Sequence, residues 1–165
     1  MQDLESPSSE AIKIASDSPY SHCGIVSVEE GSIYVIEAVG PVRKIPLDDW
    51  IENGGGRFTA MRLKEGIPVA AVPAAERYLG LPYDRLYEWD DNKLYCSELV
   101  YKAFEDGCGI ELCQLRFFES YNIEPVNRAV IQRYGYVPAG QMVVTPGDLA
   151  GSALLRVAFS NMGKD

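Results

Sequence analysis

Residues 94–104 (LYCSELVYKAF) constrain the fold most, because they combine a helical apolar pattern with a cysteine near its start. Apolar residues at 99, 100, 103 and 104 recur at the spacing of one helix face, and the preceding residues 89–93 are polar and turn-like. The pattern predicts an amphipathic helix with Cys96 at or just inside its N-terminus. Unpaired backbone N–H groups and the helix dipole lower the pKa of a thiol there from its free value of about 8.5. Cys96 is therefore a candidate nucleophile; the alternative is a small apolar residue buried at a helix start.

His22, the only histidine in the chain, lies in a predicted β-hairpin. Two runs rich in β-branched residues, 20–28 and 32–39, flank an acidic turn that contains a glycine. If the protein performs general-base chemistry with an imidazole near neutral pH, His22 must be the base. The alternative is a histidine that serves packing or a surface hydrogen bond.

Glu37, on the second strand of this hairpin, is the candidate third member of a triad. With a two-residue turn at 30–31, Glu37 pairs with Gly24 and lies diagonally from His22 on the same face of the sheet. A carboxylate there can hold one imidazole nitrogen while the other faces the thiol of Cys96. A three-residue loop would turn Glu37 to the opposite face and leave it a solvated strand glutamate.

The charge of the chain excludes some partners. Its 15 basic and 24 acidic residues give a net charge of -9, whereas a nucleic acid or an anionic membrane surface requires a basic patch. We therefore expect no nucleic-acid partner. No apolar run approaches the roughly 18 residues of a membrane span, so no integral membrane segment is expected.

The length of 165 residues suits a single α+β domain over residues 1–165 that buries its own core. No secretory signal is visible at the start of the chain. We expect a cytoplasmic protein as the sequence is written, and a periplasmic or secreted one if the N-terminus has been trimmed. The sequence does not indicate an oligomeric state.

The four cysteines are too few and too irregularly placed for a disulfide framework, and we expect free thiols. No pair has the spacing of a zinc knuckle, so no structural zinc is predicted. Cys23, directly after His22, is expected to be a small residue on the opposite face of the strand. No metal or organic cofactor is required for thiol chemistry at Cys96.

Weaker patterns predict the remaining elements. Ser8 or Ser9 is the expected cap of a helix within residues 6–19, and prolines place residues 41–47 at a sheet edge. Four aromatic residues are expected to line the cleft beside the thiol: Tyr83, Tyr87, Trp89 and Tyr95. Further elements are predicted as helical pieces at 47–52, 68–78, 115–118, 127–134 and 147–152 and as strands at 58–63 and 154–159.

Several motifs together resemble one family. SPYSHCGIV, a following strand with a glutamate, LPYD, YCSELVYKAF and VTPGDL span roughly residues 12–159. They are similar to the YiiX/YaeF branch of the NlpC-type cysteine hydrolases, the circularly permuted papain-like amidases. The order His, Glu, Cys is the permuted one. The chain begins inside or after the Gly-Asp strand with which such proteins usually start. The resemblance implies an α+β fold in which the nucleophile helix packs against an antiparallel sheet or half-barrel.

The resemblance also implies an activity. A thiol hydrolase of this kind cleaves an amide bond in a peptide, a cell-wall peptide or an N-acyl amine through a thioester acyl-enzyme. Cys96 would be the nucleophile, His22 the general acid and base, and Glu37 its orienting partner, while Tyr83 or Tyr95 would contact the oxyanion or the substrate.

Two other functions remain open. An acyltransferase of the lecithin:retinol acyltransferase type would use the same cysteine and histidine and would have an apolar channel beside Cys96. A non-catalytic binding module on the same fold would have an unreactive Cys96.

Overall fold

A three-stranded antiparallel sheet is formed by strands within residues 24–46. The computed structural model describes residues 1–163. The strands β1 (Gly24–Glu29), β2 (Ser32–Ala38) and β3 (Val42–Pro46) lie in the order β1-β2-β3. The two-residue turn between β1 and β2 has positive φ at both positions, as a tight hairpin requires. Gly24 pairs with Glu37, so the predicted register is confirmed.

The other strands of residues 1–163 form two smaller antiparallel sheets of two strands each. β4 (Thr59–Leu63) pairs with β7 (Leu155–Ser160), and β5 (Arg116–Phe117) pairs with β6 (Met142–Val143). The prediction of a helical piece at 115–118 is wrong at Arg116 and Phe117, because these two residues form β5 and pair with β6. The predicted edge position of residues 41–47 is confirmed, since β3 pairs with β2 alone.

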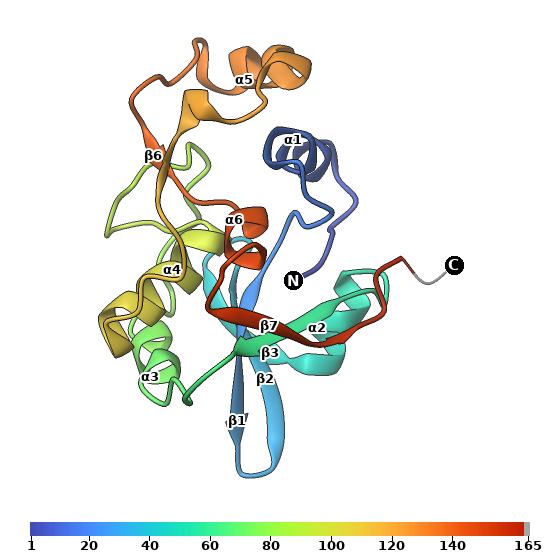
Figure 1. The fold of residues 1–165 in the computed structure, drawn as a ribbon, viewed down its shortest axis with the longest axis vertical. Helices are drawn as coiled ribbons and strands as arrows, with labels where there is room; N and C mark the ends of the chain where they lie inside the picture. Colours follow the sequence, from blue (N-terminus) through green and yellow to red (C-terminus); the bar gives the residue numbers. More distant parts are fainter. Residues whose placement is uncertain (164–165) are drawn as a thin grey trace.

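Residues 1–163 contain six α-helices (Figure 1): α1 (Pro7–Ser16), α2 (Leu47–Asn53), α3 (Ala71–Glu76), α4 (Cys96–Cys108), α5 (Asn127–Tyr134) and α6 (Pro146–Ala150). Two short 3₁₀ turns, Phe118–Ser120 and Glu124–Val126, lead into α5. The cap of α1 is Ser6 and not Ser8 or Ser9, because Ser6 has an extended backbone and its Oγ accepts the N–H of Ser9 at 3.1 Å.

Helix α4 forms the centre of the core and packs against α3, β1, β2 and α6. Its apolar face is buried as predicted, with Leu99 and Ala103 fully enclosed. Burial of a leucine side chain contributes about 2–3 kcal/mol, so this face fixes the helix against the sheet. A Cβ at Gly107 would lie 2.3 Å from the Ala70 carbonyl oxygen, and glycine therefore allows α4 to pass close to α3.

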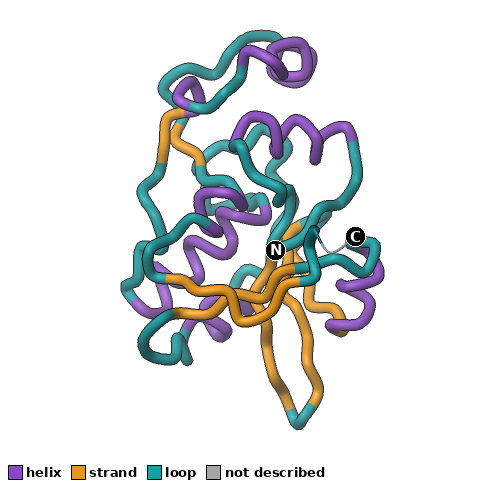
Figure 2. The backbone as a smooth tube through the Cα atoms, turned by 45° about the vertical axis from the view of Figure 1, so that its right-hand side comes forward, coloured by secondary structure: helices purple, strands orange, loops and turns teal. Residues whose placement is uncertain are grey.

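The segment with α5 lies at the end of the molecule opposite the β1–β2 hairpin (Figures 1 and 2). The two-stranded β5–β6 ribbon connects it to the rest, and α1 lies between it and the sheets (Figure 1). Within residues 1–163, no helix is long and apolar enough to cross a membrane.

Candidate active site

Cys96 is the first residue of α4, as the helical pattern predicts. Tyr95 before it has an extended backbone with φ of -98°. The carboxylate of Glu98 accepts the backbone N–H groups of Tyr95 and Asp90, at 3.4 and 3.3 Å. The side chain of Cys96 is therefore presented at a capped helix start, where the helix dipole favours an anion.

His22 lies just before β1 and is joined through its backbone to Gln2. The N–H of Gln2 donates to the His22 carbonyl at 2.9 Å, and the His22 N–H donates to the Gln2 carbonyl at 3.0 Å. The imidazole is 2% exposed, and its Nε2 donates to Oε2 of Glu37 at 2.6 Å. Nδ1 is the ring nitrogen that remains for the thiol of Cys96. The structure thus brings together the three residues of the predicted triad.

Arg43 is a further member of the site that the sequence analysis missed. It lies opposite Glu37 in the β2–β3 ladder, and its Nε and Nη2 donate to Oε1 of Glu37 at 2.9 and 2.7 Å. Both hydrogen bonds go to Oε1, which leaves Oε2 for His22, and they are strengthened by the charges of the two groups. The sequence analysis placed residues 41–47 at a sheet edge but did not predict how they pair with β2. That pairing places Arg43 opposite Glu37 and would have identified it.

The pKa values of His22 and Glu37 favour a charged pair. Burial alone would lower the pKa of His22, but hydrogen bonds with Cys96 and Glu37, and their negative charges, outweigh it and raise the pKa to about 9. Burial would raise the pKa of Glu37, but His22 and Arg43 together lower it. The imidazolium is therefore stable at neutral pH beside an ionised carboxylate.

The pKa of Cys96 lies well below that of a free thiol. The largest cause is a hydrogen bond from the thiol of Cys23; burial opposes it, and the hydrogen bond and charge of His22 add to it. The expectation that Cys23 lies on the opposite face is wrong. The regular pairing of β1 with β2 begins only at Gly24, so strict alternation does not extend to residues 22 and 23. A thiolate–imidazolium pair follows from these contacts.

Two cavities meet at Cys96. The first, of about 350 Å³, opens to solvent and is lined by residues of α1, α5, β6 and the turns between them. Its walls are mainly apolar and include Ile12, Phe118, Tyr121, Val126, Val130 and Val143. The second, of about 500 Å³, contains His22 and several hydroxyl groups, including those of Ser8, Ser21 and Tyr83. Both volumes are within the range of small-molecule sites, about 300–1,000 Å³.

The predicted aromatic residues have different places. Tyr87 lines both cavities, Tyr83 only the second and Tyr95 only the first. The Tyr95 hydroxyl accepts the backbone N–H of Val144 at 3.1 Å, which joins the VTPGDL motif to the nucleophile helix. Trp89 does not line either cavity, because it packs edge-on against Tyr101. Its predicted place in the cleft is wrong.

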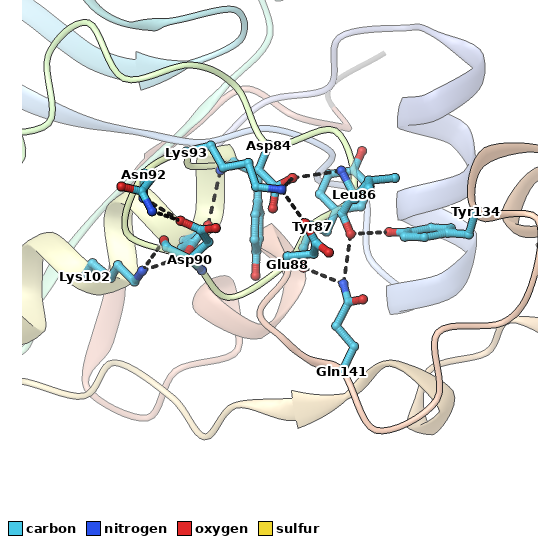
Figure 3. A network of polar contacts seen from close by, with 12 residues as sticks. Asp84, Leu86, Tyr87, Glu88, Asp90, Asn92, Lys93, Lys102, Tyr134 and Gln141 are labelled. Atoms are coloured by element: carbon cyan, nitrogen blue, oxygen red, sulfur yellow. Dashed lines mark hydrogen bonds and ion pairs between the residues drawn. The ribbon is translucent and has the colours of Figure 1, made fainter.

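The loop before α4 is held by polar contacts on several sides (Figure 3). Lys102 on α4 donates to the carbonyl of Asp90 at 2.6 Å. The carbonyl of Leu86 accepts hydrogen bonds from the Tyr134 hydroxyl at 2.8 Å and from Nε2 of Gln141 at 2.9 Å. These contacts connect the loop to the nucleophile helix and to the segment that walls the apolar cavity.

The family profile of permuted papain-like amidases, YaeF/YiiX, matches residues 4–157. The chain belongs to this family. The family is one of cysteine peptidases and amidases, so the chain is a thiol-dependent hydrolase. The α+β architecture and the family resemblance are therefore both confirmed.

Two relatives of this YaeF/YiiX chain come from Escherichia coli. The uncharacterized protein YiiX of strain K12 is 34% identical over 149 residues, which cover 86% of this chain and 74% of the relative. A crystal structure described as metalloprotein YiiX, from strain O157:H7, matches with a TM-score of 0.92 at 33% identity. The match covers 96% of this chain and 93% of the YiiX chain.

Proposed function

We propose that the protein hydrolyses the amide bond of an N-acyl amine whose acyl group is apolar, through Cys96, His22 and Glu37. The observation that carries the proposal is the place of Cys96, between a charged imidazole and an apolar cavity. An apolar acyl chain matches these walls better than the polar backbone of a peptide or cell-wall fragment, because a buried amide without a partner is costly. Membership of the family supports amide hydrolysis, and the apolar lining of the cavity supports an apolar acyl group in the substrate.

The reaction begins with the thiolate of Cys96. It attacks the amide carbonyl carbon, and the C–N bond breaks while His22 gives its proton to the departing amine. The product is a thioester at Cys96. His22, now neutral, removes a proton from water, which attacks the thioester, and the acid is released. Glu37 keeps the imidazole in one tautomer throughout, since Nε2–H donates to it.

The developing oxyanion needs donors near the start of α4. The backbone N–H of Cys96 is one, because the first N–H groups of a helix have no partner within it. Tyr83 is the second proposed donor, since it lines the same cavity as His22 and Cys96. Tyr95 is less suited to this role, because it lines only the first cavity, which His22 does not line.

Metal chemistry is not part of this proposal, although one structural relative is described as a metalloprotein. Among residues 1–163, no group of three or more histidine, cysteine or acidic side chains is arranged so that it could hold a metal ion. The donor set therefore does not fit a metal centre, and no step passes through one.

The test uses amides of one amine with acyl chains of two to fourteen carbons. We expect release of the amine to rise with chain length until the cavity is filled, and a thioester adduct of matching mass at Cys96 in quenched reactions. Equal rates for acetyl and decanoyl amides would contradict the acyl assignment. Absence of any adduct and any amine release would contradict the hydrolase proposal.

Acyl transfer is the second candidate, because an apolar cavity lies directly beside Cys96. It uses the same thioester, with an added amine or alcohol in place of water. Addition of such acceptors to the same reactions distinguishes the two. Transfer that outruns hydrolysis at millimolar acceptor would favour the acyltransferase.

A further inference from the structure

The second cavity lies on the side of Cys96 where the leaving group must be. His22 lines the second cavity and not the first. In the proposed reaction His22 gives its proton to the departing amine, so the amine half of the substrate lies on the His22 side. The acyl half then occupies the apolar cavity. The chemistry of the second cavity therefore describes the amine half.

The charge of this cavity is opposite to that of the whole chain. The chain has a net charge of -9, with 24 acidic residues. The residues that line the second cavity nevertheless include His22, Arg85 and Arg133 and no aspartate or glutamate; Arg133 lies where the two cavities meet and also lines the first, whereas Arg85 lines the second alone. The thiolate of Cys96 offsets the charge of His22, so the two arginines give the cavity a net positive charge, which is suited to an anionic ligand group.

Arg133 is held in place by neutral groups. Its Nη1 donates to the Tyr87 hydroxyl at 2.6 Å, and its Nη2 donates to Oγ of Ser8 at 2.8 Å. The guanidinium also lies over the Tyr87 ring, 5.2 Å from the ring centroid. These contacts orient the side chain and leave its charge without a counter-ion.

Arg85 is adjacent to acidic residues that bind another cation. Lys93 lies 3.3 Å from Oδ1 of Asp84 and also forms an ion pair with Glu88 (Figure 3). Within the described part of the chain, no carboxylate forms an ion pair with Arg85 or with Arg133. Both arginines are therefore available to an anion in the cavity.

We propose that the second cavity binds a carboxylate on the amine half of the substrate, so that the substrates are N-acyl amino acids with an apolar acyl group. The inference rests on the proposed function. Arg133 and Arg85 recognise the carboxylate as charged hydrogen-bond donors. The amide bond then lies at Cys96, between the apolar acyl cavity and the cationic one.

The test compares three decanoyl amides that differ in the charge of the amine half: N-decanoyl-alanine, N-decanoyl-alaninamide and N-decanoyl-ethylenediamine. We expect kcat/KM to fall in that order. Arg133→Gln and Arg85→Gln should each raise KM for N-decanoyl-alanine about 3- to 5-fold, the range of exposed arginine–carboxylate pairs, and raise KM for the alaninamide by a smaller factor. Arg133→Lys should restore part of the loss. Arg128→Gln, on the same helix but outside both cavities, is the matched control.

Binding to Cys96→Ala tests the subsite without turnover. Titration calorimetry with N-decanoyl-alanine and N-decanoyl-alaninamide should give tighter binding of the carboxylate, lost in the background of Arg133→Gln and weakened at high salt. Equal binding of the two ligands would overturn the carboxylate subsite. Cleavage of the three amides at equal rates would also overturn it while leaving the hydrolase proposal intact. Preferential binding without any cleavage would instead contradict the hydrolase proposal alone.

Discussion

The triad and the wall of the apolar cavity are built in different ways. His22, Glu37 and Cys96 are 2%, 1% and 4% exposed, and each is tied to another by a hydrogen bond or an opposite charge. The wall segment, residues 116–141, is mostly exposed, with Phe117 at 52%. It is attached to the loop before α4 by side-chain hydrogen bonds to main-chain carbonyls.

Because of this difference, we assign the reaction chemistry to the buried triad and the substrate selectivity to the exposed wall segment. A buried ion pair is costly to disturb, because removal of one partner leaves an unpaired charge in the interior. A peripheral wall joined by a few hydrogen bonds can change its side chains at little cost to the fold. We therefore expect substitutions in the triad to change kcat strongly, and substitutions in the wall to change KM weakly.

The largest effect is expected for Cys96→Ala and His22→Ala. Each should lower the rate of amide hydrolysis roughly 10³-fold or more, since both groups react directly with the substrate. Both variants should still fold and bind an N-decanoyl amide, with a lower midpoint of thermal unfolding, because each loses one partner of a buried pair. Cys108→Ser, at the far end of α4, is the control and should retain activity. An active Cys96→Ala protein would show that another residue is the nucleophile.

Glu37→Gln should lower kcat on the order of 10²-fold, the scale of general acid–base assistance. The pKa of His22 is raised to about 9, with Glu37 among the causes. The imidazolium therefore persists up to about pH 9, and removal of the negative charge lowers that limit. The upper limb of the kcat/KM profile against pH should move to lower pH. An unchanged limb, with Glu29→Gln as the exposed-strand control, would contradict the orienting role.

Cys23→Ala should have an intermediate effect, which is a smaller fraction of Cys96 in the thiolate form. The hydrogen bond from Cys23 lowers the pKa of Cys96, so its loss raises that pKa. Alkylation of Cys96 by iodoacetamide should slow more at pH 6 than at pH 8, because more of the thiol is protonated at the lower pH. Cys113→Ala is the control. Equal slowing at both pH values would show that Cys23 acts only through packing.

The smallest effect is expected in the wall. Gln141→Ala removes hydrogen bonds to the carbonyls of Leu86 and Tyr87, each contributing about 1 kcal/mol. KM for a decanoyl amide should rise about 3-fold, with kcat and the alkylation profile of Cys96 unchanged. Gln114→Ala, at an exposed position outside both cavities, is the control. A fall in kcat equal to that of Glu37→Gln would remove the distinction between the two regions.

The sequence predicted the triad region better than the wall, for a physical reason. The hairpin register follows from a two-residue turn, and the place of Cys96 follows from helical periodicity. Arg43 needed the pairing of a third strand, and Cys23 lies before the regular ladder, where alternation does not hold. The wall depends on pairing between β5 and β6, two-residue strands far apart in the chain, which no local pattern predicts.

The central claim is that Cys96 and His22 form an ion pair in the free protein. It is tested most directly by the pH dependence of Cys96 alkylation in a protein with Cys108→Ser and Cys113→Ser, with and without His22→Ala. Fast alkylation that persists well below pH 8, and is lost with His22, is the predicted result. An ordinary thiol profile that does not change when His22 is removed would contradict the claim, and would favour the non-catalytic binding module.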